Sequence, residues 1–417
     1  MNSYLESFSV DSRVISAAAD VEKDIKPYFA EIEKKEAVNQ AKVLAAFRNH
    51  KISAAHFNPT SGYGYDDLGR DTLDLVFAET FGTEAALVRP HFISGTHTLT
   101  VMLFAVLRPG DVLLSVTGDP YDTLTDVICG NEGGSLKEFG IGYDKVELKN
   151  DTFDLEGIEK ALENEKVRAV FMTRSKGYAW RESFSCGEME KAAAFIRNRR
   201  SDVLILVDNC YGEFVDTVEP SFADLFAGSL IKNPGGGLAP SGGYIAGKSD
   251  YVRLAADRLT APGLGLEGGA NFGVMKELFM GFFMAPHVVA QAVKCAVFCA
   301  ALMEKLGFEV CPKPADARND IIEAIRFGKP EYVIAFCKGL QSASPVDSFV
   351  TPEPWAMPGY QNEVIMAAGA FTQGSSIEIS ADGPIRPPYV AYMQGGLTYE
   401  SGKLAVMCGA SAVMNSI

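Results

Sequence analysis

The chain has 417 residues and carries 53 acidic against 38 basic side chains, which gives a formal net charge of −15. This acidic balance argues against nucleic acid or an anionic membrane as a partner, because both attract basic surfaces. Hydrophobic residues make up 47% of the chain, and a chain of this length buries a large core without disulfides or structural zinc. Its 40 glycines gather in a few segments, where they allow tight turns and close approach of the backbone to a ligand.

Three further features bear on compartment and metal content. The eight cysteines include no Cys-x-x-Cys pair, and the five histidines show no ligand spacing. The N-terminus lacks the basic and apolar regions of a signal peptide. The most apolar segment, residues 273–305, is interrupted by charges and is interpreted as a buried helix rather than a membrane span. We therefore expect a cytoplasmic protein without a metal site and without membrane contact.

The first 310 residues are predicted to alternate between helices and strands. Residues 12–50 are helical with a break at Pro27, and residues 51–70 form a turn-rich loop. Helices are then predicted at 71–82, 96–107 and 188–200, and strands at 85–90, 111–119, 167–175, 203–209, 224–232 and 242–248. Residues 250–310 are mostly helical. Apolar strands that alternate with helices indicate an α/β fold with a mainly parallel sheet flanked by helices.

The pattern changes after residue 310. We expect a helix near 331–340, a proline-rich turn at 352–358, an alternating strand at 371–380 and a glycine-interrupted helix at 388–417. Residues 61–310 would then form the large domain, and residues 311–417 a smaller α+β domain. The helical segment 1–60 would pack with the small domain, a neighbouring subunit, or both.

A formal P-loop pattern, G-x-x-x-x-G-K-[ST], runs from Gly242 to Lys248 and Ser249. A P-loop follows a strand and leaves its backbone amides free for phosphate. Here the residues between the two glycines of the pattern are themselves predicted as a strand. A nucleotide-binding protein therefore stays only as an alternative, with Lys248 as a surface residue at a strand end.

Two charged residues end predicted strands. Asp208 follows the fully apolar run VLILV, and Lys232 follows GSLI and precedes a glycine run. Asp208 is either a turn cap or a carboxylate that binds a cationic nitrogen. Lys232 is either a solvated surface residue or a buried amine suited to Schiff-base chemistry.

Two segments offer groups for a phosphate and a ring. Ser94, Gly95 and Thr96 open an apolar helix, where free amides and the helix dipole favour an anion, although the segment taken alone fits an ordinary N-cap better. Tyr121, in a turn after a strand, either presents its ring to a flat cofactor or packs on a neighbouring helix. Together with Asp208 and Lys232 these groups match the requirements of pyridoxal phosphate.

These motifs resemble the fold type I pyridoxal-phosphate enzymes of cysteine and methionine metabolism. The segments GYGYDDLGRD, SGTHTL, GDPYDTL, VDNCYGEF and SLIKNPGGG look most similar to the bacterial methionine gamma-lyase-related, or aluminium-resistance, family. The resemblance implies that Lys232 forms the Schiff base, Asp208 contacts the pyridine nitrogen and Tyr121 stacks on the ring. It implies that Gly95, Thr96 and Ser229 hold the phosphate. It further implies a homotetramer built from dimers, in which Tyr63 reaches the phosphate of the neighbouring subunit.

The chain departs from the family pattern at three places. Ile231 stands where a threonine precedes the lysine, and Tyr65 stands where the neighbouring-subunit loop carries an arginine, for which Arg70 is a substitute. The arginine that binds the substrate carboxylate has no clear motif. Arg386 is the candidate, with Arg174 and Tyr65 as further substrate contacts. Lys176 and Arg181 also follow a strand and are within the same candidate region.

The expected function is a pyridoxal-phosphate-dependent lyase that breaks the C–S bond of a small sulfur-containing amino acid by β- or γ-elimination. An aminotransferase or decarboxylase remains an alternative, because fold does not fix reaction. A relative that binds the cofactor without catalysis is a further alternative, given Ile231 and Tyr65.

Overall fold

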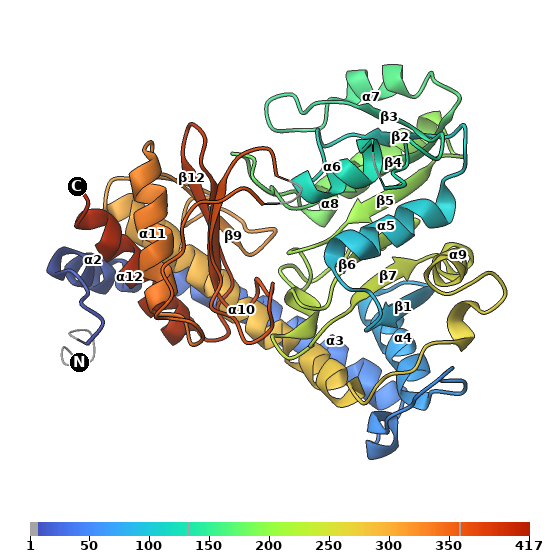
Figure 1. Ribbon diagram of the computed structural model, residues 1–417, viewed down its shortest axis with the longest axis horizontal. Coiled ribbons are helices and arrows are strands. Elements are labelled where there is room, and N and C mark those ends of the chain that lie inside the picture. Colours follow the sequence, from blue (N-terminus) through green and yellow to red (C-terminus); the bar gives the residue numbers. More distant parts are fainter. Residues whose placement is uncertain (1–6, 132, 358–359) are drawn as a thin grey trace.

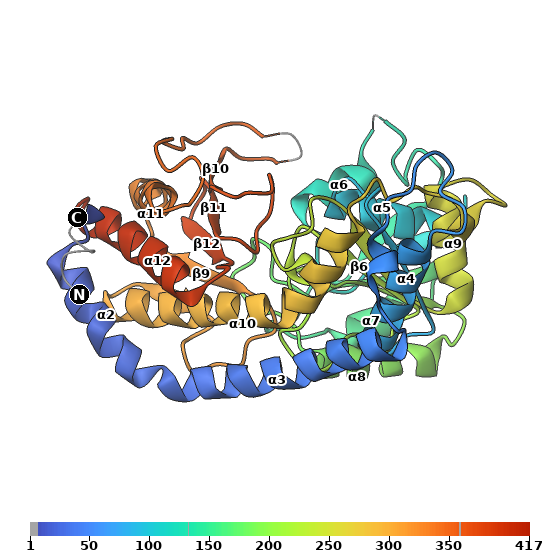
Figure 2. The ribbon, with the colours of Figure 1, turned by 90° about the horizontal axis from the view of Figure 1, so that it is seen from below.

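The computed structural model describes residues 7–131, 133–357 and 360–417. Two layered units lie side by side, and helix α10 (Met275–Lys305) runs from one into the other (Figure 1). Helix α3 (Lys26–Asn49) lies along α10 in both views (Figure 2). Two long helices therefore tie the units together.

The larger unit is built on a seven-stranded sheet with the strand order β1-β7-β6-β5-β4-β2-β3. Strand β7 pairs antiparallel with β6 and β1, and the remaining pairs are parallel. The strands are β1 (Ala85–Arg89), β2 (Val112–Ser115), β3 (Gly142–Lys145), β4 (Val167–Thr173), β5 (Leu204–Asp208), β6 (Leu225–Ser229) and β7 (Gly243–Gly247). The sheet is mainly parallel, as the apolar runs predict.

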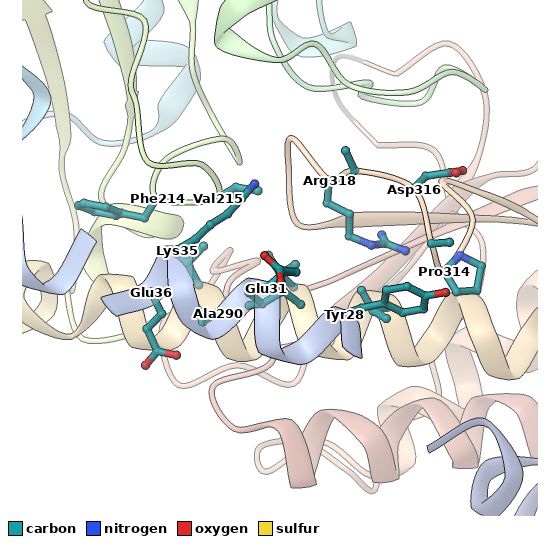
Figure 3. A pocket seen from close by; sticks show the side chains of 16 residues that line it. Tyr28, Glu31, Lys35, Glu36, Phe214, Val215, Ala290, Pro314, Asp316 and Arg318 are labelled. Carbon is teal, nitrogen blue, oxygen red and sulfur yellow. The ribbon is translucent and has the colours of Figure 1, made fainter. Parts of the chain in front are cut away.

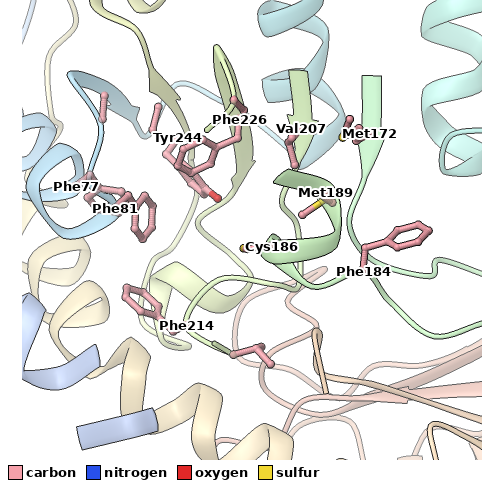
Figure 4. Close-up of a cluster of buried hydrophobic side chains, with 14 of the residues drawn as sticks. Phe77, Phe81, Met172, Phe184, Cys186, Met189, Val207, Phe214, Phe226 and Tyr244 are labelled. Atoms are coloured by element: carbon pink, nitrogen blue, oxygen red, sulfur yellow. The ribbon is translucent and has the colours of Figure 1, made fainter. Parts of the chain in front are cut away.

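Alternating side chains of the strands supply two separate hydrophobic cores. In β4, Val170 and Met172 pack into one core, whereas Ala169 and Phe171 pack into the other. Because successive side chains of a strand point to opposite faces, a strand buried on both faces is apolar throughout. Figure 4 shows part of the first core, where Phe77, Phe81, Phe214, Phe226 and Tyr244 gather beneath the sheet.

Helices cover both faces of the large sheet. One face is covered by α5 (Gly95–Val106), α6 (Asp122–Cys129) and α9 (Ser249–Leu259). The other is covered by α4 (Leu68–Phe81), α7 (Leu155–Ala161), α8 (Cys186–Arg199) and parts of α3 and α10. Three short 3₁₀ turns complete this unit: η1 (Ala54–Phe57), η2 (Asn233–Gly235) and η3 (Gly265–Glu267).

The smaller unit is an antiparallel five-stranded sheet with the order β10-β11-β12-β9-β8. Its strands are β8 (Glu309–Cys311), β9 (Ile322–Arg326), β10 (Val364–Ala367), β11 (Ser380–Pro384) and β12 (Val390–Gln394). Helices α11 (Pro330–Ser342), α12 (Tyr399–Met414) and α2 (Ser12–Asp24) share its core with the end of α10. Arg13 of α2 donates a hydrogen bond to the carbonyl oxygen of Met414 at 3.0 Å. The N-terminal helix thus packs on the small unit.

The fold class is confirmed, and most predicted elements lie within a few residues of their expected positions. The N-terminal helices break at Ile25, with Pro27 in the first turn of α3. The strand predicted to reach Lys232 ends earlier, at Ser229. Strand β3 escaped prediction because it is an exposed edge strand without an apolar run.

Two predictions in the small unit are wrong. Most of the expected strand 371–380 is a loop, because the Glu378 carboxylate accepts the backbone amides of Phe371 and Thr372 at 2.7 and 2.9 Å. A strand begins only at Ser380. The tail 388–417 is not one interrupted helix, since β12 precedes α12.

Helix α10 is long and apolar enough to cross a membrane by length and composition. In the structure, 78% of its most apolar window is buried against the protein. Residues up to Val293 contribute to the large-unit core and residues from Cys295 to the small-unit core. The apolar composition of α10 therefore reflects its position inside both cores.

A cavity of about 240 Å³ lies where α3 and α10 meet the loop that follows β8 (Figure 3). Helix α10 lines it with apolar side chains that include Val289 and Val293. Tyr28 and Arg318 stand at one end. The Arg318 guanidinium pairs with the buried Glu323 carboxylate at 2.7 Å. None of the described residues that line this cavity is a predicted site residue.

The aromatic stack under the large sheet gives a stability prediction. Phe282 is fully buried, and its ring centroid lies 3.8 Å from that of Phe77. Replacing Phe282 with alanine removes this packing and leaves a cavity, so we expect a loss of about 3–5 kcal/mol in unfolding free energy. The matched control is Phe283→Ala, since Phe283 is 36% exposed. Thermal unfolding of the two variants checks this, and equal midpoints would contradict it.

Candidate active site

A cavity of about 360 Å³ opens at the carboxyl ends of β4, β5 and β6, next to the start of α5. Ligands of parallel α/β sheets bind at this edge. The predicted residues in its wall are Ser94, Gly95, Thr96, Tyr121, Asp208, Ser229 and Lys232. The structure therefore brings together, in one place, side chains that span almost 140 residues of sequence.

The N-terminus of α5 forms one end of the cavity. The Ser94 hydroxyl accepts the amide of His97 at 3.0 Å, so Ser94 is an N-cap as well as a cavity residue. A Cβ atom on Gly95 would lie 3.4 Å from Ser229 Cβ and 3.9 Å from Lys232 Nζ. Because Gly95 has no side chain, the space between these two residues stays open. The buried Ser229 hydroxyl has no hydrogen-bond partner among the described residues. An unpaired hydroxyl at the end of β6, next to the N-terminus of α5, forms a site that fits a phosphate.

Lys232 lies in the tight turn after β6, three residues beyond the strand end. Its Nζ atom is 3.8 Å from the ring centroid of Tyr211. Burial lowers the pKa of the Lys232 ammonium, but Cys210, Tyr211 and Asp208 raise it by more than burial lowers it. The pKa of Lys232 therefore lies above its usual value. Without a ligand the amine therefore carries its proton.

Asp208 ends β5 and is buried. Its Oδ1 atom accepts the amide of Cys210 at 3.0 Å, which makes it a turn cap. Burial raises the pKa of Asp208 above its usual value, opposed by the charge of Lys232 and the Cys210 amide. The two interpretations of Asp208 are compatible, because the carboxylate both caps the turn and lines the cavity.

Tyr121 stands at the start of α6, and its hydroxyl lies 2.8 Å from that of Tyr360. Burial, with Tyr211 and Asp382 nearby, raises the pKa of Tyr121 well above its usual value, so the ring is a neutral phenol. Its centroid is 5.7 Å from that of Tyr178. An aromatic wall thus lies on one side of the cavity.

These groups fit pyridoxal phosphate by their chemistry. The cofactor needs an amine for its aldehyde, an anion site for its phosphate, a carboxylate for its ring nitrogen and a flat apolar face. Lys232, the unpaired Ser229 hydroxyl beside Gly95, Asp208 and Tyr121 offer one group of each kind around a single cavity.

Tyr63 and Tyr65 are not part of this cavity within the chain. They are 74% and 56% exposed, and their rings stack at 5.4 Å. Arg70 is buried beneath them and donates to the carbonyl oxygens of Gly64 at 2.6 Å and Gly269 at 3.0 Å. The guanidinium of Arg70 therefore holds this loop, and its role as a substitute for the missing arginine stays a prediction.

The three basic residues after β4, Arg174, Lys176 and Arg181, also form hydrogen bonds within the protein. Arg174 is fully buried, and its Nη1 donates to Asn209 Oδ1 at 2.8 Å and lies 3.4 Å from Glu219. Arg174 is thus not in the lining of the cavity that contains Lys232, and its predicted contact with the substrate stays a prediction. Lys176 donates to the carbonyl of Cys311 at 2.7 Å, and Arg181 to that of Ser175 at 2.9 Å.

Arg386 is exposed and stands at the rim of a smaller cavity of about 210 Å³, which it shares with Tyr121 and Tyr178. Its Nη1 donates to Asn362 at 3.3 Å. It is thus near the aromatic wall but outside the cavity that contains Lys232.

The P-loop alternative is wrong. Residues Gly243–Gly247 form β7, and their backbone pairs with β1 on one side and β6 on the other. These amides are not free to bind phosphate. Lys248 forms an ion pair with Asp224 at 2.5 Å.

Sequence reasoning missed several residues of the site. Cys210 and Tyr211 directly follow Asp208, and that adjacency was a usable signal. Gln373 and Gly374 come from the loop that was predicted as a strand. Asp382 on β11 is not among the residues that line the cavity, although burial raises the pKa of its carboxyl to about 7, with Tyr178 and Lys232 opposing the shift.

Known proteins resemble the chain along nearly its whole length. The family described as methionine gamma-lyase matches residues 14–414. An uncharacterized Bacillus subtilis protein, YnbB, is 50% identical over 95% of this chain and 96% of its own. The crystal structure of a carbon-sulfur lyase involved in aluminum resistance from Clostridium novyi NT is 50% identical, with a TM-score of 0.94 over 98% of both chains.

A more distant structure shares the fold. A methionine gamma lyase from Micromonospora echinospora is 16% identical, with a TM-score of 0.56 over 85% of this chain and 93% of its own. The fold is thus that of the fold type I pyridoxal-phosphate enzymes, and the resemblance drawn from the sequence motifs is confirmed. The chain belongs to the methionine gamma-lyase family.

Proposed function

We propose that this protein is a pyridoxal-phosphate-dependent lyase that breaks the C–S bond of a sulfur-containing amino acid by β- or γ-elimination. The observation that carries the proposal is the meeting of Lys232, Asp208 and the N-terminus of α5 in one cavity. The family match supports this reaction class, and so does the 50% identity to a carbon-sulfur lyase from Clostridium novyi NT.

The cavity divides into three regions that would hold the cofactor. The phosphate is assigned to Ser94, Gly95, Thr96 and Ser229. The ring nitrogen is assigned to Asp208, because a buried carboxylate is stabilised by a cationic partner. The face of the ring is assigned to Tyr121, whose neutral phenol offers an apolar surface.

Bound pyridoxal phosphate withdraws electrons from the Cα atom of an amino acid. Lys232 Nζ is assigned to hold the cofactor and then to accept the Cα proton. The acidic and phenolic groups around Nζ favour its protonated form, so the same nitrogen is equipped to deliver a proton to the leaving thiolate. The loop with Gln373 and Gly374 lines the cavity, and the Glu378 carboxylate holds its first residues by accepting the amides of Phe371 and Thr372.

Substrate binding and assembly are further parts of the proposal. Arg386 at the rim is assigned to the substrate carboxylate, since a guanidinium matches it bidentately. We further propose a cytoplasmic dimer of dimers with a shared active site. The exposed Tyr63 would then reach the phosphate region of a neighbouring subunit, and Tyr65 its substrate.

Lys232 gives the first test. Purified wild-type protein is expected to be yellow, with a visible absorbance that borohydride removes. Lys232→Ala is expected to be colourless and without lyase activity, because it lacks the amine that holds the cofactor. Lys248→Ala is the matched control, since Lys248 ends β7 and pairs with Asp224 at the surface, and it should keep both properties. A wild-type protein that never binds pyridoxal phosphate would overturn the proposal.

The products give the second test. A lyase releases thiol, ammonia and either pyruvate or 2-oxobutyrate from an amino-acid substrate, with no keto acid added. We expect this result from a panel of sulfur-containing amino acids assayed for all three products. A requirement for added keto acid would indicate an aminotransferase instead, and release of carbon dioxide a decarboxylase. Cofactor absorbance without any turnover would indicate a non-catalytic relative.

A further inference from the structure

The tip of the Lys232 side chain lies near both an aromatic ring and the start of a helix. Its Nζ atom is 3.8 Å from the centroid of the Tyr211 ring. The same atom is 3.9 Å from the position that a Cβ atom on Gly95 would occupy, in the first turn of α5. The N-terminus of a helix carries a partial positive charge, which disfavours an ammonium group. The attraction that keeps Lys232 charged therefore comes from groups other than this helix.

Several titratable groups face Lys232, yet none of the ion pairs that the described residues form includes it. These groups come from the turn after β5 and from β11, and they are Asp208, Cys210, Tyr211, Glu213 and Asp382. The contact that the structure places directly on the ammonium is the ring face of Tyr211. Ring faces attract cations, and the attraction is larger where water is displaced from the cation.

Tyr211 reaches this position through an unfavourable backbone conformation. Its φ is 72°, in the left-handed region that bulky residues rarely adopt. Because the backbone angles set the direction of a side chain, a common conformation would direct the ring elsewhere. Strain of this kind persists only where the surrounding contacts enforce it, and it gathers at functional sites.

Asn233, directly after Lys232, holds the strained turn. Its side chain is fully buried, and its Nδ2 atom donates to the carbonyl oxygens of Tyr211 at 2.9 Å and Glu213 at 3.0 Å. One side chain thus connects the turn that carries the lysine to the turn that carries the ring. The distance between the amine and the ring is therefore set by short, buried contacts.

We propose that the ring face of Tyr211 is the binding site for the free ammonium of Lys232, and that Asn233 is the positioning residue that keeps the ring there. The ring holds the amine in its charged form whenever the amine is not joined to a carbonyl group. In the proposed lyase this keeps a proton on Lys232 inside the cavity, available to the leaving thiolate. Only this use in catalysis rests on the proposed function, because the ammonium site consists of the chain alone.

The pKa of Lys232 in the cofactor-free full chain tests the proposal. Labelling with a trace of acetic anhydride over a pH series measures it, because only the unprotonated amine reacts. Mass spectrometry of the peptide that contains Lys232 follows this amine alone, and the surface residue Lys248 in the same digest is the internal standard. The proteins compared are the wild type, Tyr211→Phe, Tyr211→Leu, Asn233→Ala and, as a control on the surface, Asn164→Ala.

Tyr211→Leu is expected to lower the pKa of Lys232 by about one unit, the value of one desolvated contact between a cation and a ring. Tyr211→Phe keeps the ring face and should stay close to the wild type. Asn233→Ala should lower the pKa as Tyr211→Leu does, because the ring is no longer held over Nζ. Asn164→Ala should leave the pKa unchanged.

Three results would overturn the proposal in whole or in part. A Tyr211→Leu variant with the wild-type pKa means that the ring does not hold the ammonium. A Tyr211→Phe variant that falls as far as Tyr211→Leu assigns the ammonium to the phenol hydroxyl instead of the ring face. A wild-type pKa in Asn233→Ala removes the positioning role of Asn233.

Thermal unfolding of each variant shows whether it folds. Asn233→Ser, a smaller change, replaces Asn233→Ala if that variant does not fold, and the two Tyr211 variants decide the role of the ring independently. The labelling needs no cofactor. A wild type that never binds pyridoxal phosphate would therefore overturn the lyase function, while the pKa of Lys232 still decides the ammonium site.

Discussion

The turn that carries Lys232 has no room for a side chain at Gly235 or Gly236, and much of the site depends on this close packing. A Cβ atom on Gly235 would lie 1.7 Å from the carbonyl oxygen of Leu230, and one on Gly236 would lie 2.4 Å from the carbonyl oxygen of Gly281 in α10. Gly236 also has a left-handed backbone, with φ of 54°. The turn is thus clamped between the end of β6 and a helix that belongs to both hydrophobic cores. The position of the lysine is therefore fixed by the same packing that joins the two units.

The large unit was predictable because its strands are buried on both faces. Each central strand is a continuous apolar run, so its place in the sequence is visible without any knowledge of its neighbours. The small sheet offers weaker signals. Its strands are short and antiparallel, and the segment before β11 alternates like a strand but is drawn into a loop by Glu378. That contact joins residues only six or seven positions apart, yet nothing in the pattern reveals it.

The same contrast holds for the candidate site. Asp208, Ser229 and the start of α5 could be placed from the sequence, because parallel strands bring their carboxyl ends to one edge of the sheet. The position of Arg174 after a strand suggests the cavity, whereas its contacts with Asn209 and Glu219 hold it in the interior, and the sequence pattern does not reveal those contacts. Asp382 and Tyr360 come from the small unit and its loops, and only the packing of the two units places them near Tyr121.

The loop with Tyr63 and Tyr65 combines a buried anchor with an exposed aromatic pair. Arg70 fixes the loop from below through two backbone carbonyls, and the rings brace each other by stacking. Side chains that are free to rotate lose entropy when a surface closes over them, at a cost of about 0.5–1.5 kcal/mol for each flexible residue. The stacking of Tyr63 on Tyr65 already restricts the rotation of both side chains. A surface that meets this loop therefore gains contact area at a small entropic cost, which favours fast and selective recognition over adaptable binding.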